Sequence, residues 1–185
     1  MCAAPGGKTG HVYELAGGRV RVVAVDHSRG KVERLREEVR RLGHRVEVLR
    51  ADSRRLDRIL GAGVADYVIL DPPCSSLGVI PKVWDRKTLR DVEAAARYQR
   101  RFLRAAQRLL RPGGVLVYST CTMTLRENEE NMRYAVEELG LRLEEAWPRR
   151  FSRGIGFYGE HAIRVHPSIH RATGYFIARL RKPGG

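Results

Sequence analysis

Cysteine is scarce in this sequence, and its three copies lie far apart. Cys2, Cys74 and Cys121 contain no Cys-x-x-Cys pair, which is the spacing of many structural zinc sites. So small and odd a set also argues against a disulfide framework. We therefore predict no metal centre, and the default interpretation of each thiol is a small, buried side chain.

Long apolar runs and acidic residues are also in short supply. No run approaches the roughly 20 residues of a membrane span, and nothing after Met1 is typical of a signal peptide. We expect one soluble, cytoplasmic domain over residues 1–185, with no membrane partner. With 35 Lys and Arg against 21 Asp and Glu, the formal net charge is +14. This excess favours a polyanionic partner such as nucleic acid, although a generally basic proteome explains it too.

Apolar stretches typical of strands alternate with amphipathic helical stretches, which predicts an α/β fold with a parallel sheet. The expected strands are Val20–Val25, Val46–Leu49, Ala65–Leu70, Val115–Ser119 and Tyr175–Leu180, and the expected helices include Lys31–Leu42 and Thr88–Leu110. The Pro-Gly-Gly at 112–114 should stop the long helix. Thr124 and Glu127 have the capping-box pattern of a further helix that runs to about Leu139. Strands joined by loops are expected from Leu141 onward.

Three of these strands end at or just before an acid, namely Asp26, Asp52 and Asp71. Ligands of an open α/β sheet bind beyond the carboxyl ends of its strands, so three acids on one rim suit a nucleoside-like ligand. The chain opens with Cys-Ala-Ala-Pro-Gly-Gly-Lys-Thr at 2–9. Glycines before a helix let the backbone approach a ligand and expose amide donors. As bare spacing this segment is weak and also fits a simple turn.

Several motifs together resemble the Nop/Sun (Fmu-like) family of RNA cytosine-5 methyltransferases. The segment at 2–9, Asp-Pro-Pro-Cys-Ser at 71–75 and Ser-Thr-Cys-Thr at 119–122 match in order and spacing, and 164–167 with 174–178 is similar to the family's C-terminal signature. The resemblance covers nearly the whole chain. It implies a Rossmann-like class I methyltransferase fold with a mostly parallel seven-stranded sheet, and S-adenosyl-L-methionine as cofactor.

The resemblance also implies which residues bind the cofactor. They are Cys2, Ala3, Ala4, Pro5, Gly6, Gly7, Lys8, Asp26, Lys31, Asp52 and Asp71. In this interpretation 2–8 wraps the methionine part, Asp26 holds the ribose, Asp52 lies near the adenine and Asp71 lies near both cofactor and target base. Lys8 either adds positive potential or pairs with a carboxylate.

Carbon 5 of cytosine is a poor nucleophile, so its methylation needs a transient covalent bond to the base. A thiolate adds to carbon 6, carbon 5 attacks the sulfonium methyl, and loss of the carbon-5 proton expels the thiol. Spacing alone does not decide between Cys74, which follows a Pro as in DNA cytosine methyltransferases, and Cys121. The resemblance assigns the attack to Cys121 and product release to Cys74. Asp71 is expected to activate the base by favouring protonation at nitrogen 3.

The RNA and its contacts are less defined by the sequence. Arg97, Arg101, Arg104 and Arg108 lie at helical spacing, and a solvated basic face is the preferred interpretation over an RNA track. The segments 78–84 and 150–170 carry aromatic and basic side chains that suit unpaired bases. The Leu-Gly-Val at 77–79 resembles archaeal members more than bacterial ones, which favours tRNA over rRNA.

Two further expectations concern the front of the chain and rival functions. Family members carry a strand before the first motif, whereas this chain begins at Met1 inside it, so we expect a catalytic domain that lacks its first strand and any upstream RNA-binding domain. An amino-group methyltransferase would need an aromatic residue where this chain has Cys74. A non-catalytic RNA-binding scaffold is disfavoured by the presence of Cys74, Cys121 and Asp71.

Overall fold

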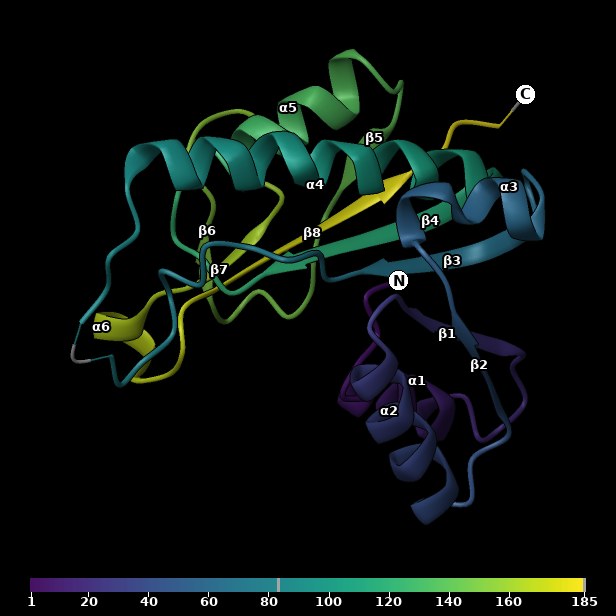
Figure 1. The fold of residues 1–185 in the computed structure, drawn as a ribbon. Coiled ribbons are helices and arrows are strands. Elements are labelled where there is room, and N and C mark those ends of the chain that lie inside the picture. Colours follow the sequence, from purple (N-terminus) through teal and green to yellow (C-terminus); the bar gives the residue numbers. More distant parts are fainter. Residues whose placement is uncertain (83, 185) are drawn as a thin grey trace.

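Two β-sheets organise the chain in a computed structural model that describes residues 1–82 and 84–184 (Figure 1). β1 (Val22–Asp26) and β2 (Val46–Arg50) form a parallel pair. The second sheet has six strands in the order β3-β4-β8-β7-β6, with β5 also paired to β8. Its strands are β3 (Ala65–Leu70), β4 (Leu110–Thr120), β5 (Arg142–Glu144), β6 (Ser152–Arg153), β7 (Ile163–Val165) and β8 (Tyr175–Arg181).

The larger sheet is mixed, so the prediction of a mostly parallel seven-stranded sheet is wrong. β3 runs parallel to β4, but β8 runs antiparallel to β4, β5 and β7, and β6 runs antiparallel to β7. Parallel neighbours need a long crossover, which α4 supplies between β3 and β4. From Leu141 onward the connections between strands are short or irregular. The strand pairs β5–β8, β6–β7 and β7–β8 of this region are antiparallel.

Seven helical segments connect the strands among the described residues. They are α1 (Gly7–Leu15), α2 (Arg29–Arg41), the 3-10 turn η1 (Ser53–Arg55), α3 (Leu56–Leu60), α4 (Leu89–Leu109), α5 (Glu129–Glu137) and α6 (Pro167–His170). α4 and α5 cover one face of the larger sheet (Figure 1). The predicted strands and long helices are confirmed to within a few residues, apart from β4, which begins five residues earlier than expected. The earlier start reflects pairing of Gly113 and Gly114 with Lys182.

The capping box was assigned to the wrong segment. α5 begins at Glu129 with Asn128 as its N-cap residue, and no side chain caps it. The pattern Thr124–Glu127 therefore does not open this helix. A true capping box occurs at the start of α4, where Thr88 and Asp91 bond to each other's backbone amides. Both segments fit the same sequence pattern, and only the tertiary structure distinguishes them.

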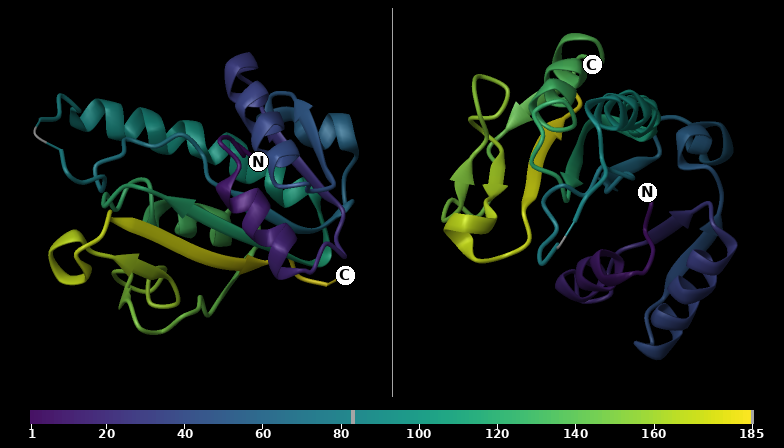
Figure 2. Two further views of the ribbon diagram at one scale, coloured as in Figure 1. Left: turned by 90° about the horizontal axis from the view of Figure 1, so that it is seen from below. Right: turned by 60° about the vertical axis from the view of Figure 1, so that its left-hand side comes forward.

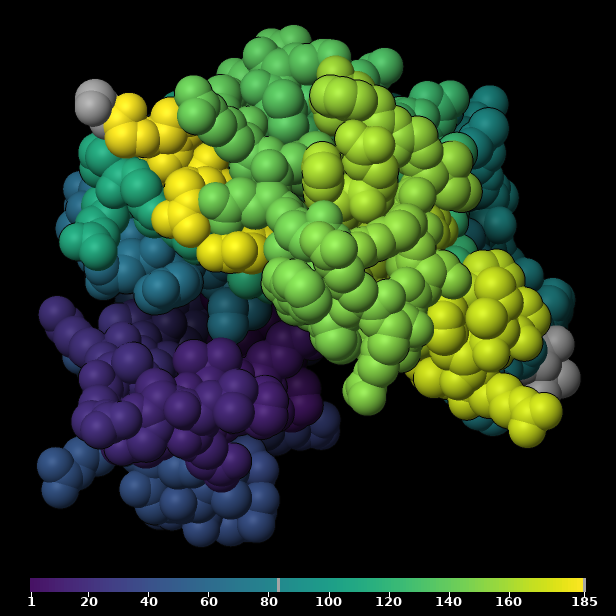
Figure 3. Space-filling model, turned by 180° about the vertical axis from the view of Figure 1, so that it is seen from behind, coloured from purple at the N-terminus to yellow at the C-terminus, as the bar shows by residue number. Residues whose placement is uncertain are grey.

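The core lies between α4 and the larger sheet. Leu103 and Ala106 of α4 pack with Leu70, Leu116 and other fully buried side chains in one apolar cluster. Residues 1–50 form a separate lobe beside this body (Figures 2 and 3). Across the described residues, no helix is both long and apolar enough to cross a membrane.

The first three residues connect the two sheets. The amino group of Met1 donates a hydrogen bond to the Ile69 carbonyl of β3 at 2.8 Å, and the Ala3 amide donates to the Val25 carbonyl of β1 at 2.9 Å. β1 and β3 share no strand pairing among the described residues. The carboxyl ends of β1, β3 and β4 nevertheless open toward one side, which is where the predicted site residues gather.

Candidate active site

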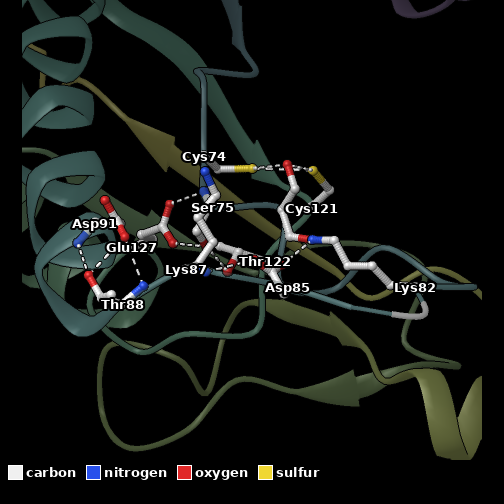
Figure 4. A network of polar contacts seen from close by, with 11 residues as sticks. Cys74, Ser75, Lys82, Asp85, Lys87, Thr88, Asp91, Cys121, Thr122 and Glu127 are labelled. Atoms are coloured by element: carbon white, nitrogen blue, oxygen red, sulfur yellow. Dashed lines mark hydrogen bonds and ion pairs between the residues drawn. The ribbon is translucent and has the colours of Figure 1, made fainter.

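The two candidate cysteines meet at the carboxyl ends of neighbouring strands. Cys74 follows β3 and Cys121 follows β4, and because these strands are parallel neighbours their ends lie together. The two Sγ atoms are 3.2 Å apart, within hydrogen-bond distance (Figure 4). Ser76, held in the left-handed region at φ 59°, places its Oγ 3.5 Å from Cys121 Sγ. Both thiols are half-buried.

Contact between the two sulfurs makes their acidities differ. The hydrogen bond to Cys74 lowers the pKa of Cys121 to about 6; burial opposes this shift and the Ser76 hydroxyl adds to it. The same hydrogen bond, together with burial, raises the pKa of Cys74 well above its usual value. The pair therefore carries one thiolate on Cys121, stabilised by a neutral thiol on Cys74, at neutral pH.

This acidity predicts selective alkylation of Cys121. The thiolate fraction rises as the pH rises through the pKa, so reaction of Cys121 with iodoacetamide should be half-maximal near pH 6 and close to its plateau at pH 7. Burial raises the pKa of Cys2 to about 11, so Cys2 should stay largely unmodified at pH 7. Peptide mass spectrometry over pH 5–9 measures both. A Cys121 midpoint near the ordinary value of about 8.5 would contradict the prediction.

Two glycines that were not predicted to shape the site hold it together. The Gly78 amide donates to the Cys121 carbonyl at 3.0 Å, and the Gly174 amide donates to the Gly78 carbonyl at 2.6 Å. A Cβ on Gly78 would lie 2.6 Å from the Gly174 oxygen and 3.0 Å from the Cys121 oxygen. The loop after β3, the end of β4 and the start of β8 thus meet through backbone atoms. The sequence signals were a glycine shortly after the Asp-Pro-Pro-Cys-Ser motif and a glycine that opens the C-terminal signature.

Gly78→Ala is accordingly expected to damage the site. The added methyl group must displace backbone rather than a flexible side chain, which should destabilise the protein by about 1–3 kcal/mol. Displacement of Cys121 from Cys74 should also raise the pKa of Cys121 toward its ordinary value, which lowers its alkylation rate at pH 7 by about tenfold. Denaturant melts and the alkylation rate of Cys121 measure the two effects. Gly184→Ala is the control, because its Cβ would meet nothing within 4 Å, and equal behaviour of the two variants would refute the prediction.

Lys8 pairs with a carboxylate, which resolves the alternative left open by the sequence. Its Nζ lies 2.5 Å from Asp71 Oδ2 and 2.8 Å from the Tyr175 hydroxyl. Burial disfavours the charged amine, but these hydrogen bonds outweigh burial and raise the pKa of Lys8. The Tyr175 hydroxyl also donates to Asp71 Oδ2 at 3.5 Å. Tyr175 was not predicted as a site residue, although it lies within the C-terminal signature.

The segment 2–8 forms a tight turn into α1. Cys2 has φ 55° and Gly6 has φ 123°, and a Cβ on Gly6 would lie 3.0 Å from Leu35 of α2. Gly6 is the N-cap residue of α1, and no side chain caps the helix. Its first amides are therefore available to a ligand. The backbone near Ala3, Ala4, Pro5 and Gly7 thus lies at the carboxyl end of β1, beside Asp26, whose Oδ2 accepts from the Ala4 amide at 3.4 Å.

The remaining predicted cofactor residues, Asp26, Asp52 and Lys31, differ in their burial and in their hydrogen-bond partners. Asp26 is buried, and its Oδ1 also accepts from the Ser28 amide. Asp52 is bound by the Arg54 guanidinium, whose hydrogen bond lowers the pKa of the carboxyl. Lys31 is exposed in the first turn of α2 and makes no hydrogen bond or ion pair within the described part of the chain.

A small hollow lies beside Asp52 and Cys2. Its lining combines polar groups with aromatic and apolar surface: Cys2, His27, Asp52, Ser53, Arg54, Pro73, Tyr98 and Phe102. Such a lining suits a nucleoside, because the base needs apolar walls and the ribose needs acceptors. The free amides of α1 and the buried Asp26 lie on the same rim, so the residues present fit S-adenosylmethionine. Within 1–82 and 84–184, no cluster of three metal-ligating side chains occurs.

Known proteins are similar to this chain in sequence. The chain is 44% identical over 184 residues to a tRNA (cytosine(72)-C(5))-methyltransferase of Pyrococcus horikoshii, covering 98% of this chain and 46% of the relative. It is 33% identical over 185 residues to ribosomal RNA small subunit methyltransferase B of Shewanella oneidensis, covering 98% of this chain and 42% of the relative. The chain thus spans less than half the length of these relatives.

Solved structures agree with the sequence comparisons. A crystal structure of NSun6 from Pyrococcus horikoshii with SFG superposes with TM-score 0.93 at 42% identity, covering all of this chain and 47% of that one. A SAM-dependent methyltransferase from Aquifex aeolicus shares the fold at 15% identity and TM-score 0.61, covering 97% of this chain and 78% of that one.

Together, the α/β layers and these structural likenesses define the class I methyltransferase fold. The profile of the family described as 16S rRNA methyltransferase RsmB/F matches residues 1–181. The chain belongs to this family of RNA cytosine-5 methyltransferases, whose cofactor is S-adenosylmethionine.

Proposed function

We propose that this chain is the catalytic part of an enzyme that methylates carbon 5 of cytosine in RNA through a covalent adduct with Cys121. The observation that carries this proposal is the pair of thiols 3.2 Å apart at the ligand rim, one acidified and one kept protonated. An inert structural cysteine has no need of such a pair, whereas attack on carbon 6 needs a thiolate at neutral pH.

The two cysteines take complementary steps in this mechanism. The Cys121 thiolate bonds to carbon 6 of cytosine, which gives carbon 5 the electron density to accept a methyl group. Once Cys121 is bound to the base, its charge no longer raises the pKa of Cys74, although burial still does, and Cys74 can lose its proton to solvent. The Cys74 thiolate then takes the proton from carbon 5, the carbon 5–carbon 6 double bond re-forms, and Cys121 leaves as a thiolate. The original pair is restored.

Asp71 is the group we assign to base activation. Lys8 and Tyr175 hold its Oδ2, and its Oδ1, which has no hydrogen-bond donor among the described residues, is placed to accept from the exocyclic amine of cytosine. Such a contact orients the ring and favours a protonated nitrogen 3 as charge builds on the base.

S-adenosylmethionine, when bound, supplies an electrophilic methyl group. We assign its binding to the turn at 2–8 with its free α1 amides, to Asp26 for the ribose hydroxyls, and to Asp52 for the adenine edge. Lys31 is assigned to the rim of this site from the family resemblance and its place in the first turn of α2.

Transfer RNA is our proposed substrate over ribosomal RNA, because the tRNA enzyme of Pyrococcus horikoshii is 44% identical and the ribosomal enzyme of Shewanella oneidensis 33%. Trp84 supports an RNA contact: it is 70% exposed, and the Arg86 guanidinium stacks on its ring at 4.3 Å. Exposed aromatic–arginine stacks suit unpaired bases. On α4, Arg97 and Arg108 pair with Glu93 and Asp57, which favours the solvated face over an RNA track.

We also propose that the complete catalytic domain holds one more strand between β1 and β3. Its support is that these two strands meet no partner on their facing edges among the described residues, apart from the bonds made by Met1 and Ala3. Unpaired strand edges are costly when covered. Denaturant melts of this chain and of a version extended upstream test it: we expect greater stability for the extended version, and equal stability would refute the extra strand.

Methyl transfer from labelled S-adenosylmethionine to unmodified tRNA and rRNA tests the proposed function. Both the chain and its extended version are assayed, and methylated cytosines are mapped by sequencing. We expect 5-methylcytosine in tRNA and no label in RNA whose cytosines are already methylated at carbon 5. Label in rRNA alone would overturn the substrate assignment, and label at a nitrogen would overturn the chemistry.

A further inference from the structure

A buried carboxylate lies behind the two cysteines. Glu127 is 0% exposed and stands in the turn before α5. Among residues 1–82 and 84–184, no Lys, Arg or His forms an ion pair with it. A carboxylate without a cation is costly to bury, so the donors that replace water around it must be well placed. Since Glu127 does not cap α5, those donors indicate its role.

Four hydrogen-bond donors surround the Glu127 carboxylate. Oε2 accepts from the Ser75 amide at 2.9 Å and from Gln99 Nε2 at 2.8 Å. Oε1 accepts from the Ser75 hydroxyl at 2.5 Å and from the Thr124 hydroxyl at 3.0 Å. Two of the four donors thus belong to Ser75, the residue directly after Cys74 (Figure 4).

The same network reaches the other side of Cys74 and the strand end of Cys121. Gln99 Nε2 also donates to the Pro73 carbonyl at 3.0 Å, directly before Cys74. The Ser75 hydroxyl lies 2.8 Å from the Thr122 hydroxyl, directly after Cys121. Ser75 and Thr122 are buried, so water cannot easily replace these bonds. One carboxylate therefore joins the neighbours of both cysteines.

We infer that Glu127 is a positioning residue that fixes the loop of Cys74 against the strand end of Cys121. It touches neither thiol and acts through Ser75, Gln99 and Thr122. The catalytic consequence rests on the proposed function, but the thiol separation that Glu127 sets is a property of the free protein. It is measurable without RNA or cofactor.

Loss of the carboxylate should free the Cys74 loop and lengthen the distance between the two sulfurs. Cys121 then loses the hydrogen bond that acidifies it, and its pKa rises toward the ordinary value. A glutamine at 127 should preserve most of the geometry. Its amide oxygen can accept from the fixed donors on Ser75 and Gln99, while its NH2 group donates to the hydroxyls of Ser75 and Thr124, which can rotate.

Alkylation of Cys121 by iodoacetamide across pH 5–9, read by peptide mass spectrometry, tests the inference on folded variants. In Glu127→Ala and Ser75→Ala we expect a higher pH midpoint and an alkylation rate at pH 7 that is about tenfold lower. Glu127→Gln should lie closer to the unaltered chain. Thr124→Ala is the matched control: it removes one bond to the same carboxylate but none to a neighbour of either cysteine, so its midpoint should not move.

Unchanged midpoints in Glu127→Ala and Ser75→Ala would overturn the inference, as would an equal shift in Thr124→Ala, which would indicate general loosening. If Glu127→Ala does not fold, Ser75→Ala carries the test, because it keeps the carboxylate and removes only the hydroxyl link. Shifted midpoints in a chain that methylates no RNA would leave this inference standing and overturn the proposed function instead.

Discussion

Cys121→Ala is expected to abolish methyl transfer, with a rate loss on the order of 10⁴-fold or more, because removal of a covalent nucleophile leaves no comparable route. The other elements of the site do not depend on the Cys121 side chain: Asp71 remains bound to Lys8 and Tyr175, and the backbone bond from Gly78 to the carbonyl of residue 121 remains. S-adenosylmethionine binding should therefore be unchanged. Labelled methyl transfer and calorimetric cofactor titration measure the two quantities.

The result also decides between the two cysteines. If Cys121→Ala keeps its activity while Cys74→Ala loses it, the nucleophile is Cys74, as in the DNA cytosine methyltransferases. If both variants keep their activity, the covalent mechanism is wrong. Cys2→Ser is not a useful control for this choice, because Cys2 belongs to the proposed cofactor turn and its substitution can affect cofactor binding.

Cys74→Ala is expected to stall the enzyme within its first turnover, after methyl transfer and before release of the RNA. Cys121 can still attack the base, but no thiol then lies beside it to take the proton from carbon 5. Loss of a general base typically slows a step by 10²–10⁴-fold, so turnover should fall by about that factor. A covalent protein–RNA adduct should accumulate and survive a denaturing gel, with the methyl label in it.

The double variant Cys74→Ala/Cys121→Ala supplies the control, since it has no sulfur to bond to the base and should give no adduct. Free methylated RNA released at the ordinary rate by Cys74→Ala would assign product release to another group. The first turnover of Cys74→Ala should also be slower near pH 7, because Cys121 has lost the hydrogen bond that lowers its pKa.

Local patterns predicted the strands and long helices well, because hydrophobic periodicity reports directly on burial. The direction of the C-terminal strands, parallel or antiparallel to their neighbours, could not be predicted from hydrophobic periodicity. β8 enters the sheet between β4 and β7, and nothing in the apolar alternation of 175–181 states whether it runs parallel or antiparallel. Connection length was the available signal, since 141–174 contains no long crossover helix.

In the site, too, local patterns predicted some features, whereas others depend on the tertiary structure. Cysteines and acids at strand ends could be predicted to share a rim, but the 3.2 Å contact of Cys74 with Cys121 depends on the register of β3 against β4. Glu127 was wrongly predicted to be part of a helix cap, because Thr124 and Glu127 have the Ser/Thr-x-x-Glu spacing of a capping box although they do not cap α5. Three of its four donors come from Ser75 and Gln99, which are 52 and 28 residues away in the chain, beyond the reach of any local pattern.

The contact of Lys8 with Tyr175 joins residues 167 positions apart, and this has a consequence for how the enzyme is made. Gly174 and Tyr175 stand at the start of β8, so a nascent chain cannot complete the rim until residue 175 has been synthesised. Premature termination between residues 122 and 173 would yield a product that has both cysteines but neither the glycine contact nor the tyrosine. Such fragments should be unable to react prematurely with cellular RNA.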